Sequence, residues 1–425
     1  MDPAMSQLMV VLSISVLASA AAAVCPYDVP ACTCTGHTLL CKDLVGLPPL
    51  VNNNDDGSIT NLTFQSGNLS NIEENSLPGK LQTLKLSDVA ITSISSDAFN
   101  GSATTLKSFS MSEGDYFQVP DALLKVNSLN ELNLSLMDIT SWKPEVLQKL
   151  GNTVHSVSLV NVNLTSWPQW LENFTLVKSL DLSFNPLNSL PPDAFTNMKN
   201  VTDLNLASTS LSDENNLNTA LTLLDDTLES LNIAMNDFAQ IPSGLLNMSR
   251  LTSLDVSSNP ISDASNRIPQ KLKILNLSRT NLQRLNSTSF PRSSALEKLA
   301  MGACQLLTNI DDLAFEPLEN LKGLLLTADP LGTIPLALTK LPNLQLLIVT
   351  GVYPECNCPP NESLVSWYHQ LKTIKVDGSC RSQYKSGDIA DYLSNDNNAL
   401  CSGLNLRANL FIYLLVVLLA VVSIL

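Results

Sequence analysis

Apolar residues recur along the chain in one arrangement, L-x-x-L-x-L-x-x-N-x-L, in which each L stands for any apolar residue. The copies follow one another about every 24 residues, a spacing typical of stacked structural repeats. Within each copy, the x-L-x-L segment predicts a short strand whose alternate side chains point inward. The first residues of thirteen successive copies are Ile59, Leu81, Leu106, Leu129, Val154, Val177, Val201, Leu228, Leu251, Leu272, Leu296, Leu321 and Leu344.

The part of each copy that follows the strand must return over the outer face to reach the next strand, so that stacked copies bury one continuous apolar core. We therefore expect an α/β solenoid over residues 59–352, a leucine-rich-repeat horseshoe with a parallel concave β-sheet of about 13 repeats. This repetition assigns the repeats to one elongated domain, although 425 residues would otherwise suggest two or three. Four aromatic residues fall where the outer segment packs inward and are expected in the core: Phe99, Phe195, Phe290 and Phe315.

The ninth residue of the repeat turns inward, and an asparagine there satisfies backbone groups that the bend would otherwise leave buried and unpaired. Only Asn185, Asn236 and Asn259 keep that amide. The other copies carry Gly67, Val89, Gly114, Met137, Val162, Thr209, Thr280, Cys304, Asp329 and Val352. We expect an irregular solenoid, with looser turns in its first five units.

Eight of the nine cysteines flank the repeats. Cys25, Cys32, Cys34 and Cys41 lie in residues 24–58, and Cys356, Cys358, Cys380 and Cys401 lie in residues 353–401. An open solenoid exposes its core at both ends, so these segments are predicted to be terminal caps. Both resemble the cysteine-rich flanking caps of animal extracellular leucine-rich-repeat proteins of the Slit, Toll and Nogo-receptor type.

That resemblance implies disulfides within each cap. It implies Cys25–Cys32 or Cys25–Cys34 at the front, which the sequence leaves open, and Cys356–Cys380 with Cys358–Cys401 at the back. Zinc binding by these cysteines is disfavoured, because an exported chain meets an oxidising compartment where thiols pair. The ninth cysteine, Cys304, occupies an inward ninth position, where we expect a buried substitute for the amide rather than a reactive thiol or an intermolecular bridge.

Both ends of the chain are apolar. Residues 8–23 end in small residues, and we interpret residues 1–23 as a secretory signal peptide, although no basic residue precedes the apolar run. A second apolar segment, residues 410–425, spans about 24 Å as a helix, less than the ~30 Å hydrocarbon core of a bilayer. With the spacer 402–409, it matches a glycosylphosphatidylinositol (GPI) signal, with Ser402 or Gly403 as the attachment residue. A membrane helix and complete secretion are the alternatives.

The charge composition and the few histidines exclude several classes of protein. The 24 basic and 39 acidic residues give a net charge of −15, which disfavours nucleic acid as a partner. His37, His155 and His369 lie too far apart along a solenoid to act together, and no catalytic or phosphate-binding motif occurs. We expect no enzymatic activity, no cofactor and no metal.

Eleven N-x-[ST] sequons are candidate glycosylation sites in an exported chain. They begin at Asn61, Asn68, Asn100, Asn133, Asn163, Asn173, Asn200, Asn247, Asn276, Asn286 and Asn361. Asn133 and Asn276 lie between the two inward leucines of a strand. Their side chains are therefore expected to point from the concave sheet.

The outward strand residues predict the character of the concave face. The central column is polar in the early and middle units: Lys85, Ser110, Asn133, Ser158, Asp181, Asn205, Asn232 and Asp255. It becomes apolar at Ala300, Leu325 and Ile348, flanked by Gly302, Gly323 and Leu346. Grouped exposed apolar residues usually mark a partner site, so Leu325, Leu346 and Ile348 are the predicted ligand contacts. The alternative is that the C-terminal cap folds over them.

The C-terminal cap carries a basic group on this acidic chain: His369, Lys372, Lys375, Arg381 and Lys385. A weak glycosaminoglycan contact is one interpretation, and a solvated basic face is the other. Together with the family resemblance, these features predict a protein on the extracellular face of the membrane that binds an extracellular protein ligand in adhesion, recognition or as a co-receptor. A secreted structural or carrier component of extracellular matrix or of a larger complex is the alternative.

Overall fold

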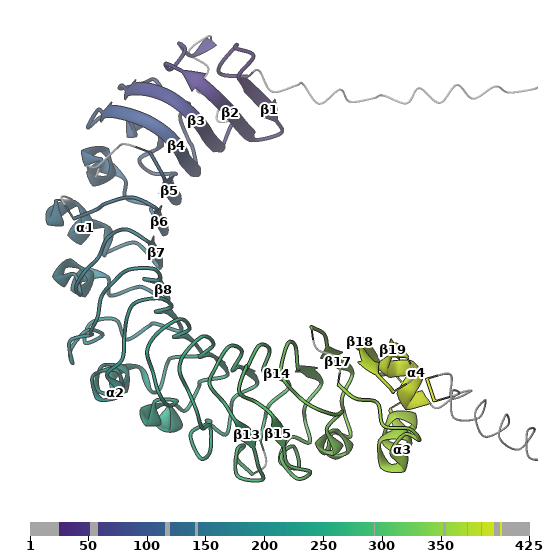
Figure 1. Cartoon of the computed structure of the whole chain (residues 1–425). Coiled ribbons are helices and arrows are strands. Elements are labelled where there is room, and N and C mark those ends of the chain that lie inside the picture. Colours follow the sequence, from purple (N-terminus) through teal and green to yellow (C-terminus); the bar gives the residue numbers. More distant parts are fainter. Residues whose placement is uncertain are drawn as a thin grey trace, which may run out of the picture.

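The structure is a computed structural model that describes residues 25–51, 58–114, 120–140, 143–292, 294–351, 354–371, 373–383, 385–394 and 400–401. The chain forms an open arc in which the strands line the inner side and the short helices lie outside (Figure 1). This arrangement confirms the predicted leucine-rich-repeat horseshoe with a parallel concave sheet. One continuous apolar core runs from Tyr27 in the front cap to Leu400 in the back cap. The four phenylalanines expected in the core are buried.

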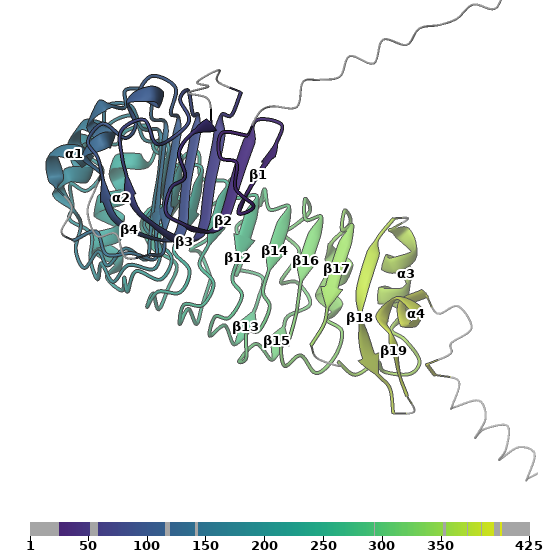
Figure 2. The ribbon, with the colours of Figure 1, turned by 90° about the horizontal axis from the view of Figure 1, so that it is seen from above.

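The concave sheet has 17 strands, which lie side by side along the arc (Figure 2). In the order of their pairing they are β1 (Cys32–Thr35), β2 (Thr38–Val45), β3 (Asn61–Ile72), β4 (Thr83–Ile94), β5 (Ser108–Ser112), β6 (Glu131–Ser135), β7 (Ser156–Val160), β8 (Ser179–Asp181), β9 (Asp203–Asn205), β10 (Ser230–Asn232), β11 (Ser253–Asp255), β12 (Ile274–Asn276), β14 (Lys298–Ala300), β16 (Gly323–Leu325), β17 (Leu346–Val349), β18 (Lys375–Arg381) and β19 (Ser386–Asp388). Neighbours pair in parallel, except β1 with β2 and β18 with β19. Every predicted repeat contributes one strand, which begins two residues after the first residue of the copy.

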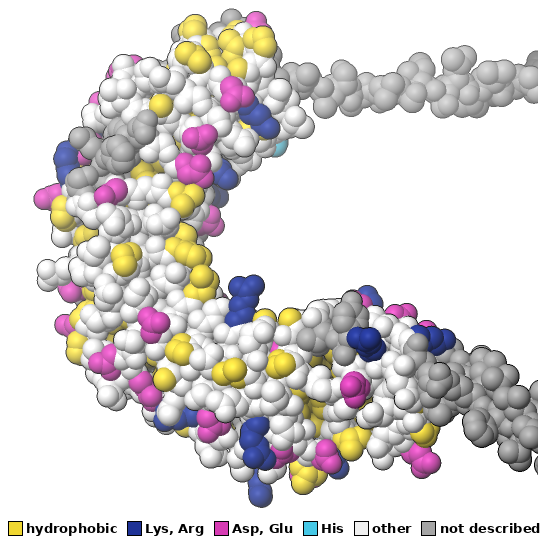
Figure 3. Space-filling view, viewed as in Figure 1, with side chains coloured by type: hydrophobic (Ala, Val, Ile, Leu, Met, Phe, Trp, Pro, Cys, Tyr) yellow, Lys and Arg dark blue, Asp and Glu magenta, His cyan; other side chains and the backbone are white. Residues whose placement is uncertain are grey.

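The outer face is made of short, varied elements. In the space-filling view, acidic and basic side chains are scattered over the arc (Figure 3). It includes a two-stranded parallel sheet of β13 (Arg284–Leu285) and β15 (Asn309–Ile310). The α-helices are α1 (Pro144–Leu150), α2 (Glu214–Leu221), α3 (Glu362–Gln370) and α4 (Ile389–Ser394). The 3-10 helices are η2 (Asn100–Ser102), η3 (Asp121–Lys125), η4 (Gln169–Asn173), η5 (Thr222–Leu224), η6 (Ser243–Asn247) and η7 (Leu336–Lys340).

The inward asparagines bond the backbone of two neighbouring units. The Oδ1 of Asn185 accepts from the backbone nitrogens of Val162 at 2.9 Å and Leu164 at 3.1 Å. Its Nδ2 donates to the carbonyls of Leu159 at 2.6 Å and Leu182 at 2.9 Å. Asn236 and Asn259 bond their neighbouring units in the same manner. Each amide therefore satisfies several polar groups that would otherwise be buried without partners.

The first units differ from the predicted loose turns. The strands β3 and β4 are 12 residues long and continue past the bend. Gly67 pairs with Val89 and Asn68 with Ala90, with register shifts further on. Backbone groups that an inward asparagine bonds in later units are here bonded between neighbouring strands. The strands shorten to five residues in β5 to β7 and to three in β8, the strand of the Asn185 unit.

The eighth residue of all thirteen units has a left-handed backbone, with φ from 53° to 80°. These residues are Ser66, Asp88, Glu113, Leu136, Asn161, Phe184, Ser208, Met235, Ser258, Arg279, Ala303, Ala328 and Gly351. A left-handed conformation costs a residue other than glycine about 1–2 kcal/mol, and only Gly351 avoids this cost. The turn recurs in every unit because it directs the ninth residue inward.

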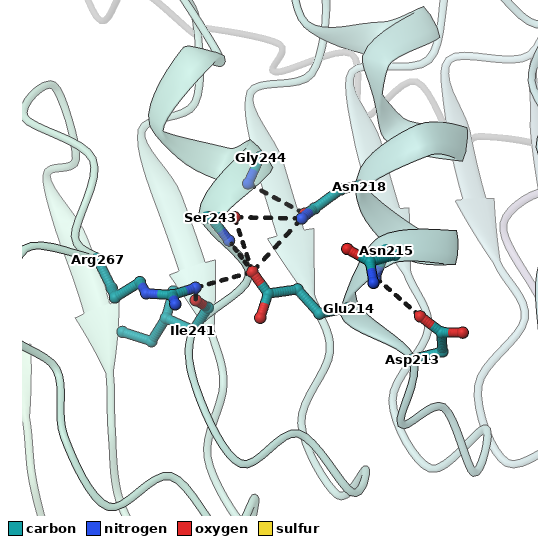
Figure 4. Close-up of polar contacts among 8 residues, drawn as sticks. All are labelled: Asp213, Glu214, Asn215, Asn218, Ile241, Ser243, Gly244 and Arg267. Carbon is teal, nitrogen blue, oxygen red and sulfur yellow. Dashed lines mark hydrogen bonds and ion pairs between the residues drawn. The ribbon is translucent and has the colours of Figure 1, made fainter.

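A polar contact on the outer face joins three successive units (Figure 4). Glu214 begins α2, whose N-terminus is capped by the side chain of Asp213. The Oε1 of Glu214 accepts from the backbone nitrogen of Ser243 at 2.8 Å, from its Oγ at 2.7 Å and from Nη1 of Arg267 at 2.7 Å. The Arg267 Nη1 also donates to the carbonyl of Ile241. We call Glu214, Ser243 and Arg267 the outer clamp.

Disulfides cross-link each cap internally. Cys25 pairs with Cys34 and Cys32 with Cys41, so Cys25–Cys32, the first alternative, is not the bond that forms. The back cap has Cys356–Cys380 and Cys358–Cys401. Cys304 is a buried free thiol whose Sγ donates to the carbonyl of Leu277 at 3.3 Å. Burial raises the pKa of this thiol, so it is a poor nucleophile.

Candidate functional site

The middle of the concave face is polar, and its polar groups are largely bonded to one another. Asp181 and Asp255 each accept from the backbone nitrogen two residues further on, at 2.9 Å. The Nδ2 of Asn205 donates to Asp181 at 3.0 Å, and that of Asn276 donates to Asp255 at 2.9 Å. These strands therefore present a surface whose hydrogen bonds are already partly satisfied.

An open hollow of about 630 Å³ lies on the C-terminal half of the concave face. It crosses the strands β11, β12, β14, β16 and β17. Gly323 and Ala300 are among its lining residues, and their small size leaves room over the middle of the sheet. Aliphatic side chains of Ile274, Leu325 and Leu346 complete the apolar lining. Ile274 is 42% exposed and Leu346 is 37% exposed, so apolar surface here remains open to a partner.

Lysines border the hollow. Lys298 and Lys322 line it from β14 and from the residue preceding β16. The Nζ of Lys322 lies 2.7 Å from the carboxylate of Glu297, and this hydrogen bond lowers the pKa of Glu297. Lys298 is exposed and has no ion pair with any described residue. The hollow thus combines an apolar lining with the ammonium group of Lys298, which forms no ion pair within the described part of the chain.

The structure brings together two of the three predicted ligand contacts. Leu325 and Leu346 line the hollow. Ile348 pairs with Leu325 in the sheet but is not among the lining residues. Ile274 does line it, but the sequence prediction did not include it, because the flanking column of outward residues that holds Gly323 and Leu346 was considered only in the last three units. Ile274 is the first outward residue of its strand, immediately before the inward Leu275, and this position was the available signal.

The C-terminal cap extends the sheet, and its described residues are not among those that line the hollow. In β18, Lys375 pairs with Leu346 and Asp377 with Ile348, while α3 and α4 lie at the end of the arc (Figure 2). Of the basic group predicted in this cap, His369, Lys375, Arg381 and Lys385 are exposed, and Lys372 lies outside the described residues. Asp377 beside Lys375 reduces the net positive charge at that edge.

The eleven sequons fall into two sets by exposure. Seven asparagines are exposed: Asn68, Asn100, Asn163, Asn173, Asn200, Asn247 and Asn361. Asn61, Asn133, Asn276 and Asn286 are half-buried. Asn133 and Asn276 lie on the concave strands β6 and β12, and Asn276 itself lines the hollow. A glycan on Asn276 would stand within the hollow.

The remaining candidate groups are dispersed. His37 lies between β1 and β2, His155 precedes β7 and His369 belongs to α3. No cluster of three His, Cys, Asp or Glu suited to a metal ion occurs in the described residues. Within that same part of the chain, no helix is long and apolar enough to cross a membrane. The predicted signal peptide, residues 1–23, and the predicted attachment residues Ser402 and Gly403 lie outside the described residues.

The repeated strands, the inward asparagines and the two disulfide-bonded caps define a leucine-rich-repeat solenoid. A family model described as leucine rich repeat matches residues 175–216. Osteomodulin from Rattus norvegicus is 31% identical to this chain over 186 residues. That match covers 42% of this chain and 42% of osteomodulin, so this chain spans less than half of the length of this relative.

Solved structures share the fold at low sequence identity. The mouse RP105/MD-1 complex matches with a TM-score of 0.59 and 19% identity, over 81% of this chain and 60% of that one. The Toll–Spätzle complex of Drosophila matches with a TM-score of 0.56 and 17% identity, over 88% and 54%. The Leptospira interrogans protein LIC12759 gives 0.52 and 17%, over 80% and 89%.

Proposed function

We propose that this chain is an extracellular recognition protein that binds a protein ligand on the C-terminal half of its concave sheet. The observation that carries this proposal is the hollow at β11 to β17, where Ile274 and Leu346 remain exposed. Grouped apolar surface of this kind usually marks a partner site. The solved structures of RP105 with MD-1 and of Toll with Spätzle are complexes, which supports a protein ligand for this solenoid shape.

The energetics of the hollow suit an anchor within a larger interface. Burying one aliphatic side chain contributes about 1.5–3 kcal/mol, and a few such anchors commonly carry most of the affinity of an interface. The polar strands on either side then supply complementarity. The net charge of −15 disfavours polyanions such as nucleic acid as the ligand.

The substitution Leu325→Asp tests this proposal, because it places a charge within the apolar lining. Purified full-length protein is immobilised and exposed to medium conditioned by cells of the source organism, and retained proteins are quantified by mass spectrometry. We expect at least one extracellular protein to be retained by the wild type and reduced about tenfold or more by the substitution.

The matched control is Ser158→Asp, which introduces the same charge in the same outward column on β7. Both variants should keep the thermal unfolding midpoint of the wild type within a few degrees. Equal recovery of every retained protein by wild type and Leu325→Asp, with both folded, would refute the concave C-terminal site.

We further propose that the protein is exported by residues 1–23 and anchored through a GPI lipid at Ser402 or Gly403. All eight cap cysteines are paired, which suits an oxidising compartment. A phosphatidylinositol-specific phospholipase should release the protein from intact cells, and residues 410–425 should be absent from its mature form. Detection of peptides from residues 410–425 in the mature protein would contradict the lipid anchor. Recovery in the medium without phospholipase would favour the secreted structural or carrier role.

A further inference from the structure

The hollow carries information on the chemistry of its ligand, provided that the proposed function holds. Its apolar part is accessible because Gly323 has no side chain. A Cβ at this position would have only Cγ of Lys298 within 4 Å, at 3.8 Å, which is an ordinary contact. The space above Gly323 is therefore open to a side chain from a partner, next to Leu325 and Leu346 and separated from Ile274 by Lys298.

The same contact places a charge beside this space. The hydrocarbon stem of Lys298 lies next to Gly323, and its ammonium has no carboxylate within ion-pair distance in the described part of the chain. Lys322, on the other side of Glu297, also borders the hollow. Asp255 lies at the opposite end, where Asn276 and the backbone of Ser257 already bond its carboxylate.

We infer that the hollow accepts an acidic, apolar segment of a protein, with an aliphatic or aromatic side chain over Gly323 and a neighbouring carboxylate at Lys298. Complementary charge of this kind contributes specificity and accelerates association. The apolar lining fits this class of ligand better than a sulfated polysaccharide, which has no apolar side chain to cover Ile274, Leu325 and Leu346. An open hollow on a sheet also differs from the enclosed sites that bury most of a small molecule.

Two substitutions separate the apolar and the charged parts of this inference. Gly323→Leu fills the hollow from its floor, and its Cβ would make only an ordinary contact with Lys298. Its matched control is Gly332→Leu, because Gly332 is exposed and a Cβ there meets nothing within 4 Å. Lys298→Glu reverses the charge at the rim. Its control is Lys85→Glu, an exposed lysine on the distant strand β4.

The probe is a phage-displayed library of random peptides, selected on immobilised full-length wild-type protein. We expect enriched peptides to carry Asp or Glu within two residues of a large apolar residue. Their affinity, measured with synthetic peptides, should fall about tenfold or more in Gly323→Leu and in Lys298→Glu. The two control variants should bind them like the wild type.

Three other outcomes of the peptide experiment would each refute a specific part of this inference. In the first, the selected peptides lack acidic residues, bind Gly323→Leu more weakly and bind Lys298→Glu like the wild type. This would refute the acidic ligand but leave the proposed concave site intact. Peptides unaffected by Gly323→Leu would refute the hollow as a peptide site. In the third, a heparin oligosaccharide binds the wild type and Gly323→Leu but not Lys298→Glu. That result would show that the ligand of the hollow is a polyanion and would refute the protein segment.

Discussion

Asp329 occupies the inward ninth position that asparagine holds in the Asn185 unit. Its Oδ1 accepts from the backbone nitrogen of Cys304 at 2.7 Å, as an asparagine oxygen would. Its Oδ2 takes the place of the amide nitrogen and has no hydrogen-bond partner among the described residues. Burial raises the pKa of Asp329 to about 7. The protonated acid suits this position, because its O–H can donate to a carbonyl as the amide does.

The substitution Asp329→Asn should stabilise the protein most at alkaline pH. The unfolded chain releases the Asp329 proton near pH 4, whereas the folded protein holds it up to about pH 7. Stability of the wild type therefore falls as pH rises from 4 to 7, and the full penalty persists above pH 7. At 1.36 kcal/mol per pH unit, the gain in unfolding free energy from Asn should approach roughly 2–4 kcal/mol at pH 8.

Urea denaturation of the wild type and Asp329→Asn from pH 4 to pH 8 measures this gain. The difference between the two proteins should grow with pH and level off above the folded pKa. A difference that stays constant with pH would show that Asp329 titrates normally in the folded protein.

At the scale of the element, the outer clamp holds α2 against the next two units. Burial alone would raise the pKa of Glu214, but the hydrogen bonds from Ser243 and Arg267 outweigh it, so the pKa is lowered. Glu214→Ala should lower the unfolding free energy by about 1–2 kcal/mol at pH 7, because Ser243 and Arg267 lose their acceptor. The stabilisation by Glu214 should disappear as pH falls through its lowered pKa.

The control for the clamp is Glu229→Ala. Glu229 pairs with Arg250 at the surface, and both side chains are more than 40% exposed, so this loss should cost less than about 1 kcal/mol. Urea denaturation at pH 7 and pH 3 compares the two variants. If both substitutions lowered the unfolding free energy equally at pH 7, the outer clamp would contribute no more than an exposed ion pair.

The back cap is the second element whose contribution can be measured. Trp367 in α3 is buried, and its Nε1 donates to the carbonyl of Leu341 in the last repeats at 3.0 Å. The disulfide Cys358–Cys401 closes 43 residues around this contact. Loss of such a bond typically costs about 2–5 kcal/mol, so Cys358→Ser should expose Trp367 at a lower denaturant concentration, as tryptophan fluorescence reports.

Cys304→Ser provides the comparison within the same chain. The serine hydroxyl can replace the thiol as donor to the carbonyl of Leu277, so the loss of stability should be much smaller. Indistinguishable denaturation of Cys358→Ser and wild type would show that the back cap does not depend on this disulfide.

At the scale of the whole molecule, the sequence predicted the thirteen repeat strands because each repeat carries its own leucines. It did not predict the four further strands of the 17-stranded sheet, β1, β2, β18 and β19, which the caps contribute. The strand lengths at the front could not be predicted in this way. They depend on hydrogen bonds between neighbouring units, as at Gly67 and Val89. The outer clamp was equally hidden, since Glu214 and Arg267 are 53 residues apart. Of the hollow, Leu325 and Leu346 were predicted. Ile274 occupies the same position in its repeat as Leu346 in the last one, so the repeat pattern contained the signal for it.

The reversed strands at the two ends of the concave sheet limit how molecules of this protein can assemble. A sheet of parallel repeats offers at each edge a template on which another copy could continue the same register, and repetition of that step would build a filament. Here the described sheet ends in β1, four residues long, and in β19, three residues long, and both run against their neighbours. Cys32–Cys41 fixes the first reversal covalently. At each described edge another copy would therefore meet a short reversed strand, and not a repeat strand whose parallel register it could continue.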